Sequence, residues 1–222
     1  MITPSTTKEF IPYASRKQIA FVGDSLTLGN WSLTTGGYRS TLLAQLAAVQ
    51  PGGYYPNVVG ADFTSYSYPM IGYSAMRTDQ ILDLYVTPQL AAIPSITMPI
   101  APDVVFLVAS GNDLLQGRSQ ALAMADLSSI IDAFRNAKST CHVFVGSLID
   151  MDLNTANMQN WSAAIQAMVQ ARGDYNTQVH FVDLFSALGF YTPTLWADDK
   201  HPNTAGYAIL GNAWYAAYDL IF

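Results

Sequence analysis

The chain has 222 residues, of which half are hydrophobic and only 12% are charged, and its net charge is −6. This length suits one domain with a substantial core, and the low charge content argues against disorder. There is no basic patch or run of Lys and Arg, which argues against nucleic acid or an anionic membrane as a partner. The single cysteine, Cys141, excludes an internal disulfide and a multi-cysteine metal site, and we expect it in the core.

We expect a single domain over residues 1–222, with residues 1–18 as a lead-in along its surface. This lead-in is polar and lacks the apolar segment that a signal peptide would have. No apolar stretch of the sequence reaches the ~20 residues that a membrane-spanning helix needs. Frequent Tyr, Thr, Ser and Asn with few Lys are compatible with an extracellular protein but leave the compartment open. The sequence makes no prediction of the oligomeric state.

Five short apolar runs predict β-strands. In chain order they are Ile19–Gly23, Val58–Gly60, Val104–Ala109, His142–Gly146 and Val179–Val182. The runs are continuous rather than alternating in polarity, which is the pattern of strands buried on both faces of a parallel sheet. We therefore predict an α/β fold, a three-layer α/β/α sandwich of flavodoxin-like type around a mostly parallel five-stranded sheet.

Helical stretches alternate with these strands. Their apolar stripes run over Leu42–Val49, Thr78–Tyr85, Met124–Phe134, Met158–Met168 and Tyr207–Tyr218. We expect Pro51-Gly52-Gly53 to end the first helix, Asn154 or Thr155 to cap the fourth, and Asn203 to cap the last. The predicted loops and connectors cover residues 27–37, 61–74, 88–102 and 188–200.

Polar clusters follow the predicted strands at their C-terminal ends. Gly23-Asp24-Ser25 follows the first strand, Gly72 lies in the loop after the second, and Gly111-Asn112-Asp113 follows the third. A fourth cluster, Asp198 to His201, comes after the last strand. Because parallel strands end at the same edge of a sheet, we expect these clusters to form one site.

The serine in the first cluster points to nucleophilic chemistry, and a serine hydroxyl needs a base to remove its proton. His142 and His180 each begin a strand, so we expect them at the opposite edge of the sheet as boundary histidines. His201 alone follows a strand and precedes a helix, on the edge that carries Ser25. His201 is therefore the candidate base.

A carboxylate near His201 can hold the tautomer of the imidazole and stabilise the imidazolium. Asp198, three residues before His201, can reach its Nδ1 in a bent loop, whereas the competitor Asp199 is expected to point elsewhere. The rival G-x-S-x-G pattern is absent, since the segment 72–76 lacks the second glycine. The chain also lacks a P-loop, a GxGxxG and a metal-binding spacing, so we predict no cofactor and no metal.

These four clusters resemble, in order, the four sequence blocks of the SGNH (GDSL) hydrolase family. The blocks are Gly23-Asp24-Ser25-Leu26, the lone Gly72, Gly111-Asn112-Asp113 and Asp198-x-x-His201, so the resemblance spans residues 23–201. It implies a catalytic triad with Ser25 as nucleophile, His201 as base and Asp198 as orienting acid. It also implies an oxyanion hole formed by the backbone N–H groups of Ser25 and Gly72 and the side-chain amide of Asn112.

The segment Gly36-Gly37-Tyr38-Arg39 is similar to one in carbohydrate acetylesterases of this family. The first hypothesis is therefore a serine esterase that deacetylates a carbohydrate, with a small-molecule or glycan ester as its partner. Trp31, Tyr73 and Trp196 lie in predicted rim loops, where flat rings either stack against a sugar or pack within the loops. Asp24 is a further candidate for substrate binding.

Two alternatives remain open from the sequence. One is a general short-chain carboxylesterase, thioesterase or lysophospholipase of the same fold. The other is a catalytically silent glycan-binding module, against which the intact set of Ser25, His201 and Asp198 argues.

Overall fold

The computed structural model describes residues 16–32, 36–49, 56–59, 70–90, 101–152 and 155–222. Its sheet has the order β2-β1-β3-β4-β5, with every pairing parallel among these residues. The strands are β1 (Gln18–Gly23), β2 (Asn57–Val59), β3 (Val104–Val108), β4 (His142–Gly146) and β5 (Val179–Val182). This is the flavodoxin-like strand order, and the predicted fold class is confirmed.

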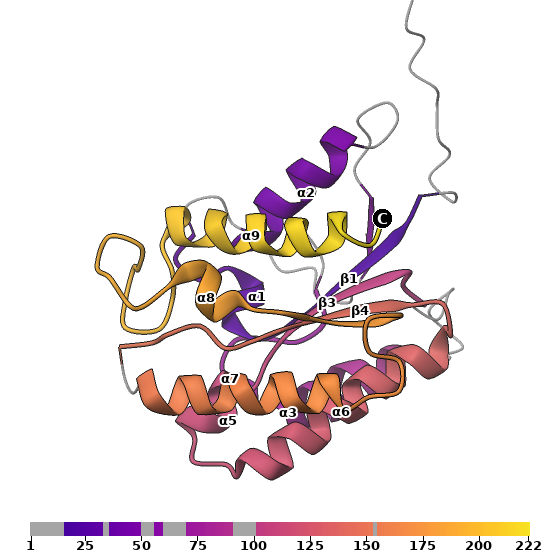
Figure 1. Cartoon of the computed structure of the whole chain (residues 1–222), viewed down its shortest axis with the longest axis horizontal. Helices are drawn as coiled ribbons and strands as arrows, with labels where there is room; N and C mark the ends of the chain where they lie inside the picture. The colour runs from indigo at the N-terminus through magenta and orange to yellow at the C-terminus, as the bar shows by residue number, and fades with distance from the viewer. Residues whose placement is uncertain (1–15, 33–35, 50–55, 60–69, 91–100, 153–154) are drawn as a thin grey trace, which may run out of the picture.

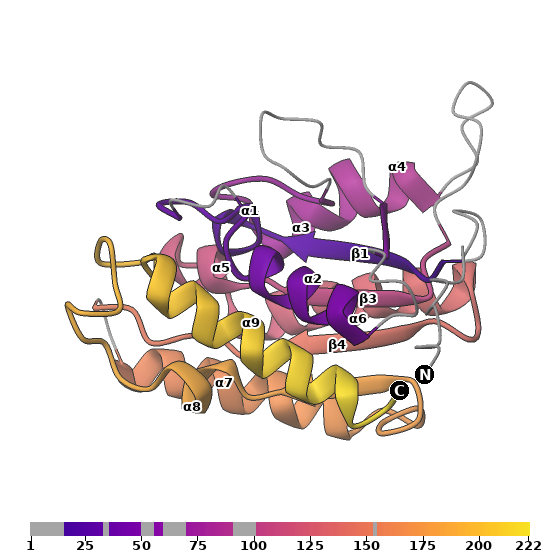
Figure 2. The ribbon, with the colours of Figure 1, turned by 90° about the horizontal axis from the view of Figure 1, so that it is seen from above.

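Helices cover both faces of the sheet (Figure 1). On one face lie α2 (Tyr38–Val49) and α9 (Thr204–Asp219), which pack against each other, with α8 (Leu184–Leu188) beside α9. On the other face lie α3 (Thr78–Ile81), α6 (Gln120–Ala137) and α7 (Thr155–Gln170). Figure 2 shows α2 and α9 running side by side in front of the strands. Because both faces are covered, the strands are apolar at nearly every position.

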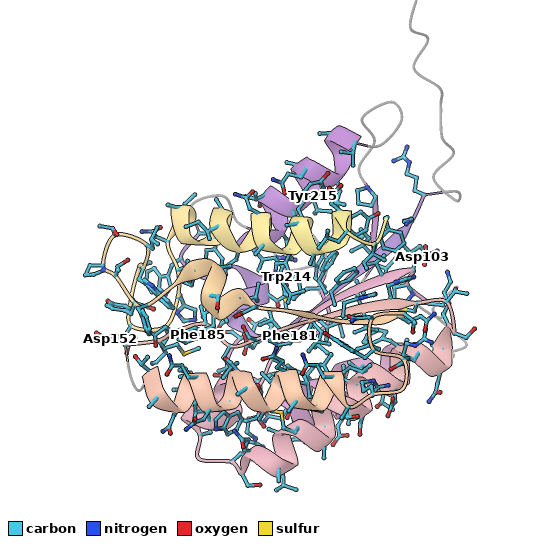
Figure 3. All side chains as sticks on the ribbon, viewed as in Figure 1. Asp103, Asp152, Phe181, Phe185, Trp214 and Tyr215 are labelled. Carbon is cyan, nitrogen blue, oxygen red and sulfur yellow. The ribbon has the colours of Figure 1, made fainter. Side chains whose placement is uncertain are left out.

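The core is organised around a row of aromatic rings across the central strands. The register places Phe21, Phe106 and Phe144 next to one another, with ring centroids 5.7 and 5.3 Å apart. Trp214 of α9 meets Phe106 edge-on at 5.5 Å, and Figure 3 shows it between α9 and the sheet. Cys141 is buried as expected. No helix in the described ranges is long and apolar enough to cross a membrane.

Several short helices fall where loops were predicted. The expected loop 27–37 begins inside α1 (Ser25–Leu28), and the expected connector 88–102 begins inside α4 (Thr87–Leu90). The chain between α3 and α4 is a π-helical stretch, Leu82–Val86, while α5 (Gly111–Leu115) and α8 were not predicted. Helices of four or five residues complete little more than one turn, so they leave no periodic signal.

The expected cap of the last helix is present, because the Asn203 side chain accepts hydrogen bonds from the backbone N–H groups of Ala205 and Gly206. Other predictions lie outside the described residues. These are the lead-in up to residue 15, the helix end at 51–53, Gly60, the loop up to residue 69, the connector over 91–100 and the cap at Asn154.

His142 and His180 form a stacked pair at the N-terminal ends of β4 and β5. Their rings are nearly parallel with centroids 5.4 Å apart, and His142 Nδ1 lies 3.1 Å from His180 Nε2. The His180 ring also stacks on Phe144, at 4.7 Å, and so extends the aromatic row of the core. Burial, and secondarily the charge on His142, lowers the pKa of His180 from 6.5 to about 4.

Because the pKa of His180 is lowered, we expect the free energy of unfolding to decrease in acid. Between pH 6.5 and about 4, His180 binds a proton in the unfolded chain but not in the folded one. The free energy of unfolding should therefore fall as pH drops through this window, and His180→Phe should remove that contribution. Urea unfolding of both proteins between about pH 7 and pH 4 measures it. A wild-type-minus-variant difference that stays constant with pH would contradict the prediction.

Candidate active site

Ser25 begins α1 immediately after β1, at the C-terminal edge of the sheet. The preceding residue, Asp24, caps this helix, because its Oδ1 accepts the Leu26 N–H at 3.0 Å. A Cβ at Gly23 would overlap the carbonyl oxygen of Val108 on the neighbouring strand, so the strand-to-helix turn needs glycine there. These contacts hold the Ser25 hydroxyl at the end of the strand.

His201 lies beside this serine although the two are 176 positions apart in the chain. Its Nε2 is 2.9 Å from Ser25 Oγ, and its Nδ1 is 2.9 Å from Asp198 Oδ2. Because Nδ1 faces a carboxylate, the neutral ring carries its proton there, which leaves Nε2 free to accept the Ser25 proton. The three side chains expected to form the triad are therefore connected by hydrogen bonds.

Asp198 is held in place by backbone donors. Its Oδ1 accepts the N–H groups of Lys200 and His201, at 2.8 and 2.7 Å. Burial alone would raise the pKa of Asp198, but the hydrogen bonds from His201 and from these backbone groups outweigh it, so the pKa is lowered. The competitor Asp199 has its carboxylate 3.9 Å from Lys200 Nζ, and the carboxylate bonded to His201 Nδ1 is that of Asp198.

Gly72 is brought to the site by an extension of the sheet. Ile71 pairs with Val22, accepting the Gly23 N–H at 3.0 Å and donating to the Phe21 carbonyl at 2.8 Å. Gly72 itself has φ +123°, and a Cβ there would overlap the Gly23 carbonyl oxygen. In the described part of the chain, the backbone N–H groups of Ser25 and Gly72 have no protein acceptor. This is the state that the predicted role of oxyanion donor requires of them.

Gly72→Ala is expected to destabilise the fold by about 2–4 kcal/mol, because the added methyl group must displace backbone and the residue must keep a positive φ. Gly117→Ala is a matched control. Gly117 also has a positive φ, +73°, but a Cβ there has nothing within 4 Å, so we expect a loss of only about 1 kcal/mol. Urea unfolding measures both, and equal losses would contradict the proposed backbone clash.

Asn112 lies in α5, which follows β3, and its amide is already engaged. Its Nδ2 donates to Asp24 Oδ2 and to the carbonyl of Met76, each at 3.1 Å. Asp24, the candidate for substrate binding, thus uses both carboxylate oxygens inside the protein and is only 3% exposed. Burial, partly offset by the Leu26 N–H and by His201, raises the pKa of Asp24 to about 6.

A pocket of about 310 Å³ is lined by Ser25, His201, Asn112 and Asp24, whereas Gly72 and Asp198 are not among its lining residues. Its walls include seven residues for which the sequence predicted no role in the site: Leu26, Ser74, Ala75, Gly111, Leu115, Met151 and Lys200. Met151 follows the C-terminal end of β4, so the rule that directed attention to the other strand ends would have found it. Among the described residues, no group of three His, Cys, Asp or Glu is placed to hold a metal.

The three rim aromatics differ in their placement. Trp31 and Tyr73 are 66% and 43% exposed, but neither lines the pocket. Trp196 is 5% exposed and packs against the ring of Tyr191, with centroids 5.3 Å apart. The loop-packing alternative therefore holds for Trp196, whose ring faces are not open to a sugar.

The comparisons with known proteins identify the family of this chain. A model of the GDSL-like lipase/acylhydrolase family matches residues 21–209. The chain belongs to this family. It is therefore a GDSL-type acylhydrolase, an enzyme of ester hydrolysis.

Relatives of this GDSL-type protein include carbohydrate esterases. The family 3 carbohydrate esterase of Clostridium thermocellum has a TM-score of 0.71 and 25% identity, covering 92% of this chain and 96% of that one. A family 3 carbohydrate esterase of Talaromyces cellulolyticus shares the fold, with a TM-score of 0.73 at 19% identity over 92% and 98% of the chains. A protein of Acetivibrio thermocellus, provisionally named endoglucanase X, is 33% identical over 116 residues, which are 51% of this chain and 49% of that protein.

The Gly36–Arg39 segment has an internal role in this GDSL-type protein. Arg39 is fully buried, and its guanidinium donates to the carbonyls of Gly36 and Leu28, at 3.3 and 3.2 Å. Tyr38 OH lies 3.1 Å from Thr27 Oγ1 of α1. The segment thus braces the chain that follows the candidate nucleophile, without entering the pocket.

A larger pocket, of about 490 Å³, lies elsewhere in this GDSL-type protein, where α7 and α8 flank the edge strand β5. Phe181 and Phe185, labelled in Figure 3, line it together with Phe190. It includes no residue of the Ser25–His201–Asp198 set. The smaller pocket is therefore the candidate active site, because it contains both the candidate nucleophile Ser25 and the candidate base His201.

Proposed function

We propose that this protein is a serine esterase that removes acetyl groups from a carbohydrate through a Ser25–His201–Asp198 triad. The observation that carries the proposal is the 2.9 Å contact between His201 Nε2 and Ser25 Oγ, which places a base on the hydroxyl. The continuous hydrogen-bonded chain to Asp198 supports a catalytic centre over a silent glycan-binding module.

In the proposed reaction, the Ser25 oxygen bonds to the acyl carbon while its proton passes to His201 Nε2, and Asp198 stabilises the imidazolium. The N–H groups of Ser25 and Gly72 and the amide of Asn112 bind the oxyanion. His201 then gives the proton to the alcohol oxygen as the ester C–O bond breaks. A water molecule repeats the sequence on the acyl-serine, releases the acid and restores the Ser25 hydroxyl. The reaction uses no cofactor.

The size of the pocket supports a short acyl group. A volume of about 310 Å³ is at the lower end of the range for small-molecule sites. Leu115 and Met151 supply apolar wall, and Lys200 with Ser74 supplies polar groups. The carbohydrate esterases among the structural neighbours support a sugar as the alcohol part.

Glycoside cleavage, which the name of the Acetivibrio thermocellus relative suggests, has less support. That reaction uses two carboxyl groups that flank the glycosidic bond. Here Asp198 is hydrogen-bonded to His201, and Asp24 is buried against Leu26 N–H and Asn112. Neither carboxylate is free to face a sugar.

An ester panel combined with covalent labelling tests the proposal. We expect p-nitrophenyl acetate to be hydrolysed with a kcat/KM at least about tenfold above that of the octanoate. Acetate should also be released from acetylated xylan or another acetylated glycan. Preference for octanoate would favour a general carboxylesterase, thioesterase or lysophospholipase. Failure of a fluorophosphonate to label Ser25 would instead favour a binding module.

A further inference from the structure

The orientation of the Asn112 amide is set by two acceptors. Asp24 Oδ2 and the Met76 carbonyl both lie 3.1 Å from Nδ2, so the nitrogen of the amide, rather than its oxygen, faces these two acceptors. A flipped amide would place Oδ1 against two other oxygens, which repel it. The two acceptors therefore fix the orientation of the Asn112 amide, with its nitrogen and not its oxygen toward Asp24 and Met76.

This orientation matters for the proposed chemistry, because only the nitrogen can donate to an oxyanion. Losing one preorganised donor typically lowers kcat by about 10²- to 10³-fold. An amide that is held in place beforehand needs no reorganisation when the negative charge develops. The groups that hold it thus determine how well the donor works.

Of the two acceptors, Asp24 is the one fixed to the nucleophile. It directly precedes Ser25, and its other oxygen is tied to the Leu26 N–H, so its carboxylate moves with α1. Its contact with Asn112 joins α1 to α5 across 88 positions of the chain. The carboxylate is almost completely buried, and a hydrogen bond to an ionised acceptor is about twice as strong as a neutral one.

We propose that Asp24 is a positioning residue, whose buried carboxylate orients the Asn112 amide as an oxyanion donor and sets its place relative to Ser25. This inference rests on the proposed function. It assigns Asp24 an effect on the rate of the chemical step rather than contact with substrate. This role is an alternative to the substrate binding that the sequence predicts for Asp24.

A double-mutant cycle between Asp24→Asn and Asn112→Ala tests the inference. Asp24→Asn keeps an oxygen for the Leu26 N–H but turns an NH₂ group toward Asn112, which favours the flipped amide. We expect kcat to fall by about 10- to 100-fold with KM within about threefold. In the Asn112→Ala background, the same change should cost less than about threefold, because the residue through which Asp24 acts is gone. Equal losses in both backgrounds would overturn the inference.

The second readout is the rate constant for fluorophosphonate labelling of Ser25, which does not depend on knowing the substrate. It should show the same coupling between positions 24 and 112, and its absence would also overturn the inference. If wild-type Ser25 is not labelled at all, the proposed function fails first, so the two failures are distinguishable. Asp24→Ser, which retains a capping oxygen too short to reach Asn112, repeats the test if Asp24→Asn does not fold.

Asp183→Asn is the matched control. Asp183 also caps a short helix, since its Oδ1 accepts the Ser186 N–H at 2.9 Å at the start of α8. It lies outside the pocket that contains Ser25. We expect unchanged kcat and labelling for Asp183→Asn, and a labelling defect equal to that of Asp24→Asn would mean that loss of the charge of a helix-capping carboxylate explains both.

Discussion

Ser25→Ala is expected to lower kcat for ester hydrolysis by at least about 10³-fold while the protein stays folded. The change removes the hydroxyl oxygen that lies 2.9 Å from His201 Nε2, and with it the proposed nucleophile. The fold should tolerate it because Asp24, and not Ser25, caps α1. Initial rates on p-nitrophenyl acetate and a thermal unfolding curve measure the two effects separately.

Ser74→Ala is the control for this prediction. Ser74 lines the same pocket and accepts a hydrogen bond from Asn30 Nδ2 at 3.2 Å, whereas the hydroxyl beside His201 Nε2 is that of Ser25. Its loss should reduce kcat by less than about tenfold. If Ser74→Ala were inactive and Ser25→Ala active, the nucleophile would have to be assigned to Ser74.

Asp198→Asn is expected to lower kcat by about 10⁴-fold with little change in stability, as for the corresponding change in a serine protease triad. An amide at this position can still accept the N–H groups of Lys200 and His201 through its oxygen. Its NH₂ group would then face His201 Nδ1 and donate to it. The proton of the imidazole would be on Nε2, where it cannot accept the proton of Ser25.

Asp199→Asn tests whether this effect belongs to one carboxylate. The substitution Asp199→Asn removes a carboxylate charge from the next position in the chain. In the wild-type protein this carboxylate lies 3.9 Å from Lys200 Nζ. We expect its kcat to stay within about threefold of wild type, since exposed ion pairs contribute little. A large loss in Asp199→Asn, or a loss below tenfold in Asp198→Asn, would exclude the assigned triad.

Much of the site could be predicted because it depends on strand direction. Continuous apolar runs indicated parallel strands, and parallel strands bring their C-terminal ends to one edge. Ser25, Asn112 and His201 each follow a strand, so their convergence could be inferred without coordinates. The same argument distinguished His201 from His142 and His180. The structure places His142 and His180 at the N-terminal ends of β4 and β5, at the edge of the sheet opposite to His201.

Contacts between side chains distant in the sequence could not be predicted in this way. Apolar periodicity says which face of an element is buried, but it carries no information on the partner of a polar group. The contact of Asp24 with Asn112 and the burial of Trp196 against Tyr191 are decided by packing between separate segments. Position 72 requires glycine because a side-chain methyl group there would overlap the carbonyl oxygen of Gly23.

The sequence by itself thus determined the fold class, the edge of the sheet that carries the polar clusters, and the residue types available for ester chemistry. Only the tertiary structure decided that Asp24 faces inward, that Arg39 is a brace, and that Leu115 and Met151 form the pocket wall. The physical reason is that strand polarity is repeated along the backbone and is visible in local patterns. Hydrogen-bond partners and pocket walls depend on distances between segments that meet only after the chain has folded.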